Sequence, residues 1–195
     1  MKKKISIALA AFAFALLLVV GSVAGTIAYL TSETEVVKNT FTVGDITITL
    51  DETDVDDSTA DKDRDIVNTY KLLPGENYTK DPTIHVESGS SECYLFVNIV
   101  NNIESVEDPT NNIASQLNAN GWVLISNGVY YYNQKVDAST AAKDVVVFEK
   151  IYIDADATNA DLEAVAGNTV EVTAYAVQTS GFDTAVDAWN ATFGA

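Results

Sequence analysis

The chain has very few of the residues from which enzyme sites are commonly built. Its single cysteine, Cys93, cannot form a disulfide within the chain. Its single histidine, His85, cannot supply the His-x-x-x-His pair of a zincin peptidase, and a Ser-His-Asp triad would need the same residue without a Gly-x-Ser-x-Gly elbow. A phosphate-binding glycine loop and a dinucleotide fingerprint are also absent. We therefore expect no catalytic residues, no metal ligands and no bound cofactor, and a protein that is not an enzyme.

Basic residues are scarce too, with 11 Lys and Arg against 28 Asp and Glu. Such a chain repels nucleic acid and anionic membranes, so no nucleic-acid partner is expected. Calcium is the one metal that could bind weakly, because carboxylates gather at Asp54, Asp56 and Asp57 and again at Asp154 and Asp156. Neither stretch has the central glycine and terminal glutamate of an EF-hand loop, so a solvated acidic face is the favoured interpretation.

The N-terminus has the layout of a secretory signal peptide. A basic tip, Lys2 to Lys4, precedes a largely apolar run over residues 5–20 and a stretch of small residues over 21–28. We therefore expect a protein that is tethered to the membrane as a precursor and then secreted to the cell surface or beyond. An uncleaved anchor is the alternative, because residues 5–30 could cross a bilayer core of about 30 Å.

Small residues at Thr26 and Ala28 place the preferred cleavage between Ala28 and Tyr29, and residues 22–24 form a second candidate. Loss of residues 1–28 removes three lysines and no acids, so the processed chain has eight basic and 28 acidic residues and a formal charge of −20. Cys93 lies in an apolar run and is interpreted as a buried thiol. A secreted fold without disulfides must rely on its core, on sheet hydrogen bonds or on neighbours in an assembly.

The rest of the chain, residues 29–195, is interpreted as one mainly β domain. Runs rich in β-branched and aromatic residues are separated by Gly, Asn, Asp or Pro, and Asn127-Gly128 is a tight-turn signal. Strands are expected over residues 46–50, 83–86, 94–100, 122–125, 129–132, 145–153 and 170–178. Because long helices do not alternate with these strands, the pattern favours an antiparallel β-sandwich.

A few short helices should lie at the periphery of this sandwich. They are expected over residues 112–117 and 183–193, with Asp183 as a candidate N-cap, and with a weaker pattern over 155–165. The dense acids of residues 51–65 predict a solvated loop between strands.

Several segments resemble the TasA/camelysin family of secreted Gram-positive proteins. The N-terminal signature is AGTIAYLTSETEVVKNTFTVGDITITLDE, residues 24–52. Residues 73–76 (LPGE), 94–97 (YLFV) and 174–189 (AYAVQTSGFDTAVDAW) are similar to later parts of the family, whereas residues 51–65 and 130–132 match no part of it. These segments run from near the start of the chain to near its end, so the resemblance covers essentially the whole chain. Their order, and the signal peptide before them, make the set specific.

The resemblance implies a jelly-roll-like β-sandwich that is exported through a SipW-type signal peptidase to the cell surface or biofilm matrix. It also implies self-assembly into a fibre, in which other matrix proteins could take part. A camelysin-like surface metallopeptidase that uses carboxylates and His85 is one alternative. A monomeric module that binds a ligand on its loops is another.

The same resemblance implies that assembly proceeds by strand donation. Cleavage would free residues 29–38, in which Tyr29, Leu30, Val36 and Val37 are the apolar members of a possible donor strand without Pro or Gly. The alternative is that the segment folds back on its own sandwich or stays disordered.

Overall fold

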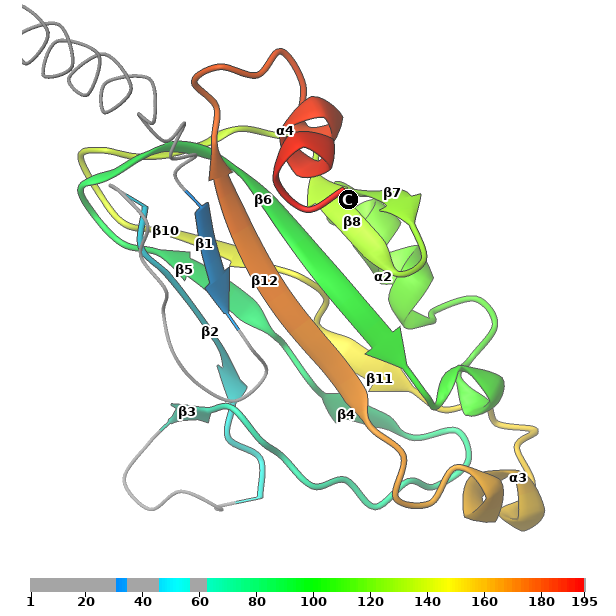
Figure 1. Ribbon diagram of the computed structural model, residues 1–195. Coiled ribbons are helices and arrows are strands. Elements are labelled where there is room, and N and C mark those ends of the chain that lie inside the picture. The colour runs from blue at the N-terminus through cyan, green and yellow to red at the C-terminus, as the bar shows by residue number, and fades with distance from the viewer. Residues whose placement is uncertain (1–30, 35–45, 57–62, 195) are drawn as a thin grey trace, which may run out of the picture.

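The computed structural model describes residues 31–34, 46–56 and 63–194. In this part of the chain every strand pair is antiparallel, and the strands form two layers with three short α-helices around them (Figure 1). The predicted fold class, mainly β with antiparallel sheets and a few short helices, is confirmed. The predicted signal peptide, its cleavage site at Ala28 and Tyr29, and the donor residues Leu30, Val36 and Val37 lie outside the described residues.

The larger layer is a six-stranded sheet with the order β1-β12-β6-β8-β7, in which β9 also pairs with β6. Its strands are β1 (Thr31–Thr34), β6 (Ser90–Asn101), β7 (Trp122–Ser126), β8 (Val129–Tyr132), β9 (Val136–Ala138) and β12 (Val170–Gln178). The longest ladder joins β12 to β6 from Val170↔Asn101 to Gln178↔Cys93. We call this layer the large sheet.

The second layer is a four-stranded sheet with the order β10-β5-β2-β3, and a two-stranded ladder of β11 and β4 continues near its end (Figure 1). Its strands are β2 (Ile48–Thr53), β3 (Arg64–Asp65), β5 (Thr83–Val86) and β10 (Lys143–Val146), and the ladder joins β4 (Asn77–Thr79) to β11 (Lys150–Tyr152). We call this layer the small sheet.

The main core lies between the two sheets because alternate residues of each strand point inward. Ile48 of β2 and Ile84 of β5 meet Leu95 and Val97 of β6, and all four are fully buried. Cys93 is buried in the same core, as the sequence predicts. The β-sandwich therefore needs no cross-link to hold its two layers together.

A second, smaller core covers the outer face of the large sheet. Phe96 of β6 points away from the main core and packs at 5.2 Å, between ring centroids, from Trp189 of α4 (Ala185–Thr192). Tyr175 and Phe193 complete the aromatic group around Trp189. Of the other helices, α2 (Ile113–Ala119) lies beside β7 and β8 at one side of the large sheet, and α3 (Asn159–Ala164) lies at the end of the sandwich where β12 begins (Figure 1). A 3-10 turn spans Glu104–Val106.

Several predicted bounds differ from those of the structure by a few residues, and three differences have a clear physical cause. The strand expected over residues 145–153 is divided into β10 and β11, because their partners β5 and β4 are separated by Pro82, which has no N–H to continue a ladder. The N-cap of α4 is Thr184 instead of Asp183, since the Thr184 side chain accepts from the backbone N–H of Asp187. The acidic loop expected over residues 51–65 is shorter, because Thr53 of β2 pairs with Arg64 of β3.

Candidate functional site

Five charged side chains meet on the outer face of the small sheet. Asp51 lies on β2, Arg64 on β3, His85 on β5 and Asp144 on β10, while Asp81 comes from the segment before β5. Residues with inward side chains alternate with these along each strand, so the charges share the solvent side. We call this group the carboxylate network.

His85 is at the centre of the carboxylate network. Its Nδ1 is 2.7 Å from Oδ1 of Asp144, which is paired with it across β10 and β5, and its Nε2 is 3.0 Å from Oδ1 of Asp51. A ring with a carboxylate at each nitrogen must donate at both, which matches the charged imidazolium. Partial burial opposes the charge, but the hydrogen bonds to Asp51 and Asp144 outweigh it and raise the pKa of His85 above its usual value.

Arg64 binds the other end of the network. Its Nε donates to Asp51, and its Nη1 lies 3.1 Å from Oδ2 of Asp81. Thr53 donates to both oxygens of Asp81, from its backbone N–H at 2.7 Å and from its hydroxyl at 2.9 Å. Burial of Asp81 acts in the other direction, but these hydrogen bonds and the guanidinium hold the pKa of its carboxyl below the usual range. The network therefore joins three carboxylates to two cations and connects β2, β3, β5 and β10 with the segment before β5.

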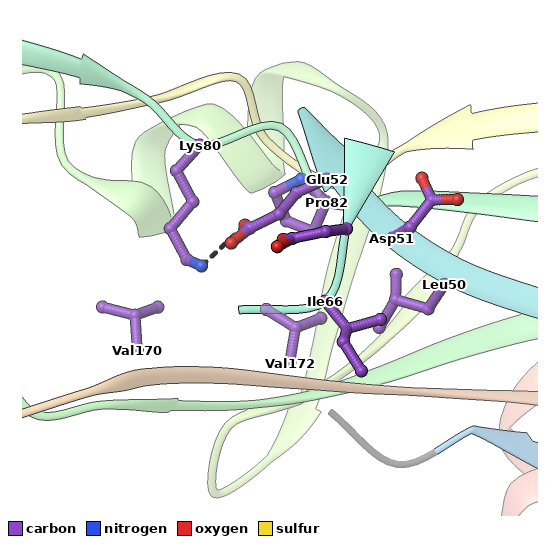
Figure 2. A pocket seen from close by; sticks show the side chains of 9 residues that line it. Leu50, Asp51, Glu52, Ile66, Lys80, Pro82, Val170 and Val172 are labelled. Atoms are coloured by element: carbon purple, nitrogen blue, oxygen red, sulfur yellow. Dashed lines mark hydrogen bonds and ion pairs between the residues drawn. The ribbon is translucent and has the colours of Figure 1, made fainter. Parts of the chain in front are cut away.

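A second ion pair lies on the inner side of β2. Glu52 points to the opposite face from Asp51, is 5% exposed, and accepts from Nζ of Lys80 at 2.7 Å. Figure 2 shows this pair between the layers, with Val170 and Val172 of β12 opposite it. Asn68 donates to the other oxygen of Glu52 at 3.0 Å. The buried carboxylate is thus satisfied at both oxygens, as a charge in this position must be.

The Glu52–Lys80 pair lies at the floor of a groove of about 660 Å³. One wall is formed by the chain after β3, including Ile66 and Tyr70. The other wall is formed by Val170, the first residue of β12, and by Asn168 just before this strand. The ammonium of Lys80 lies 5.9 Å from the ring centroid of Tyr70. Burial is the main cause that raises the pKa of Tyr70, and the nearby carboxylates raise it further. Its size and mixture of apolar and amide groups suit a short extended peptide or a small organic molecule.

Sequence reasoning found only part of this site. His85 lies in a strand as expected, but its partners Asp51 and Asp144 are distant in sequence and were not identified. The buried position of Glu52 could have been predicted, because Glu52 continues the inward-facing series of Ile46, Ile48 and Leu50. Nothing in the pattern indicated that Lys80 would neutralise it.

Comparison with known proteins gives one family match. A family model described as camelysin metallo-endopeptidase matches residues 1–172. Neither the curated proteins nor the solved structures contain a significant match. The family description points to a peptidase, so our expectation that the chain is not an enzyme is contradicted.

The described residues do not fit the metal that such a family implies. Nowhere in residues 31–34, 46–56 and 63–194 do three His, Cys, Asp or Glu side chains gather in a way that could hold an ion. Both ring nitrogens of His85 are occupied by carboxylates, and burial raises the pKa of the Cys93 thiol to about 12, which opposes the thiolate that a metal requires. We therefore derive no chemistry through a metal.

The family match includes the N-terminal segment, the strands from β1 to β11 and the first residues of β12, and so contains every residue of the carboxylate network. In the described part of the chain no helix is both long and apolar enough to span a membrane. With 172 of 195 residues matched, the chain belongs to the camelysin metallo-endopeptidase family.

Proposed function

We propose that the processed chain is a secreted protein of the cell surface or biofilm matrix that assembles with copies of itself by exchanging its N-terminal strand. The observation that carries the proposal is β1, which pairs with the edge of β12 from Thr31↔Val177 to Thr34↔Ala174. The same hydrogen bonds can be made by the same segment of another copy, which is the principle of strand exchange.

Two further features support the proposal. A strand of four residues contributes few ladder bonds, so replacing it by an identical strand costs little. The segment also follows the predicted cleavage site directly, so a SipW-type peptidase that cuts between Ala28 and Tyr29 would release the donor from the membrane. N-terminal sequencing of secreted material tests the export step, and a retained residue 1–28 segment in the membrane fraction would contradict it.

The test of strand exchange compares a chain that starts at Tyr29 with one that starts at Asn39. Electron microscopy of both under matched salt and acid conditions should show fibres only when residues 29–38 are present. Fibres of the same kind from both chains, or from neither, would mean that strand exchange is wrong.

Proline substitutions provide a matched pair of variants within β1. In an antiparallel ladder only alternate residues direct their N–H at the neighbouring strand, so Ser32 and Glu33 differ in this respect. Ser32→Pro and Glu33→Pro introduce the same ring at adjacent positions, and only one of them removes a donor to β12. Fibre formation should be lost in one variant and reduced far less in the other. Unchanged assembly in both would contradict the proposal.

Peptidase activity is the second candidate function, and the family match is the observation that favours it. It is compatible with assembly, because exchange of β1 leaves the groove and the carboxylate network in place. Casein turnover and zinc content of the purified chain, with His85→Ala as the control, test it. Turnover no higher than that of buffer at saturating zinc would contradict it.

A further inference from the structure

After the N-terminal region, the sequence contains one long stretch without charge. No Asp, Glu, Lys, Arg or His occurs from Pro109 to Gln134, although 39 of the 195 residues of the chain are Asp, Glu, Lys or Arg. In the fold this stretch forms α2, β7 and β8, which lie together at one side of the large sheet (Figure 1). These three elements therefore carry no charged side chain of their own, in a protein with 28 acidic residues.

The outermost strand of this face is β7. Among the strands that the structure describes, β7 pairs only with β8, from Trp122↔Tyr132 to Ser126↔Val129, so its other edge has no ladder partner. An edge of this kind is a template for another strand. The usual protections, a lysine or a proline on the edge, are absent from its sequence WVLIS.

Apolar side chains accompany the open edge. Leu124 is 56% exposed and Val123 is 39% exposed, although both belong to a strand. We call the edge of β7 with Val123 and Leu124 the neutral edge.

We propose that the neutral edge is an interface between two copies of this chain, in which β7 of each copy pairs with β7 of the other and continues the large sheet across a two-fold axis. An antiparallel strand edge is self-complementary about such an axis. Apolar residues that are exposed in one copy are then covered by the same residues of the second.

The charge distribution favours a second copy of this chain as the partner that binds the neutral edge. Copies of a chain with a net charge of −17 repel each other through most of their surface, and repulsion is weakest where neither surface carries charge. A basic partner would gain nothing from the neutral edge, because the acids that attract it lie elsewhere. The interface is also independent of the proposed strand exchange, since β1 and β7 are at opposite ends of the large sheet.

The first experiment places a charge on the edge. In the chain from Tyr29, which contains every described element, Leu124→Lys puts two like charges close to the proposed axis, and Leu73→Lys makes the same change at a loop residue that is 51% exposed. Both variants change the net charge equally. The dimer dissociation constant measured by sedimentation velocity should be about ten-fold larger for Leu124→Lys than for Leu73→Lys. Equal effects, or a parent chain that is monomeric at every salt concentration, would overturn the proposal.

The second experiment uses the fact that the native cysteine is fully buried. In a pairing centred on the midpoint of β7, the two copies of residue 124 lie opposite each other with Cβ atoms about 5 Å apart, within reach of a disulfide. Leu124→Cys should therefore form a covalent dimer under diamide about ten-fold faster than Leu73→Cys, because pairing raises its effective concentration. Equal rates would overturn the proposal.

The same cross-linking in a chain that starts at Asn39 separates this interface from strand exchange. Removal of residues 29–38 should abolish fibres if strand exchange occurs, but should leave cross-linking of Leu124→Cys unchanged. Loss of cross-linking in the shorter chain would show that the neutral edge does not act as an independent interface and would overturn the proposal.

Discussion

At the scale of single residues, His85 makes the stability of the protein depend on pH in a direction that can be predicted. Its pKa is raised in the folded state by Asp51 and Asp144 against the effect of burial. The stabilisation is therefore fully present below the unfolded pKa of about 6.5 and is lost as pH rises through the folded pKa. The free energy of unfolding of the parent chain should exceed that of His85→Gln most at about pH 6 and least at about pH 9.

Urea denaturation of both chains at the two pH values measures this difference. Asp144→Asn is the matched variant, because it removes one of the two carboxylates and leaves the ring with Asp51. Its pH dependence should be intermediate. A difference between parent and His85→Gln that grows with pH would mean that the imidazole is neutral in the fold.

The Glu52–Lys80 pair should respond more strongly to a single substitution than to a double one. Lys80→Met leaves the buried carboxylate with Asn68 as its remaining side-chain donor. The loss of one partner from a buried ion pair costs about 3–5 kcal/mol, whereas replacing both charges costs much less. Urea denaturation of Lys80→Met and of Lys80→Met with Glu52→Gln tests this. Additive losses in the double variant would show that the two charges do not depend on each other.

At the scale of elements, the β7–β8 hairpin depends on Gly128. Gly128 has φ +82°, and a Cβ there would lie 2.5 Å from the carbonyl oxygen of Ile99. Gly167 also has φ +82° but has no atom within 4 Å of the same position, so it is a matched control. A left-handed backbone costs either alanine about 1–2 kcal/mol, and the backbone clash should add about as much again for Gly128→Ala. Thermal unfolding of both variants measures the difference, and equal losses would contradict it.

The same hairpin shows how far the sequence predicts the elements. Val129–Tyr132, Thr83–Val86 and Val170–Gln178 are found with the predicted bounds, because each is a β-branched or aromatic run between turn residues. The division of residues 145–153 was not predictable from the run itself, which has no turn residue. It arises from Pro82, a residue far away in sequence that interrupts the partner ladder.

The candidate site could likewise be predicted only as far as contacts within one strand decide it. Local alternation along β2 places Asp51 outside and Glu52 inside, and could be read from the sequence. The partners of these residues could not, because Asp144 meets His85 across a gap of 59 residues and Lys80 meets Glu52 across 28. Such contacts are set by the order of strands in the sheet, which periodicity does not contain.

At the scale of the whole molecule, the large sheet has two different ends. One end is β1, whose strand the proposed exchange would supply from another copy, and the other is the neutral edge on β7. Exchange at one end would join copies along a chain, while pairing at the other would join chains side by side. Because both contacts must form between acidic molecules, electrostatic repulsion opposes each of them.

Assembly should therefore strengthen with salt and with mild acid. After processing the chain carries eight basic and 28 acidic residues, a formal charge of −20. Screening limits repulsion to about 10 Å at 0.1 M salt, and protonation of exposed carboxylates near a pKa of about 4 removes it. Light scattering of the chain from Tyr29 should rise with salt at neutral pH and rise again as pH falls towards 4. Leu124→Lys should reduce the response to salt, whereas Leu73→Lys should not. Assembly that weakens on adding salt would point instead to attractive ion pairs between copies.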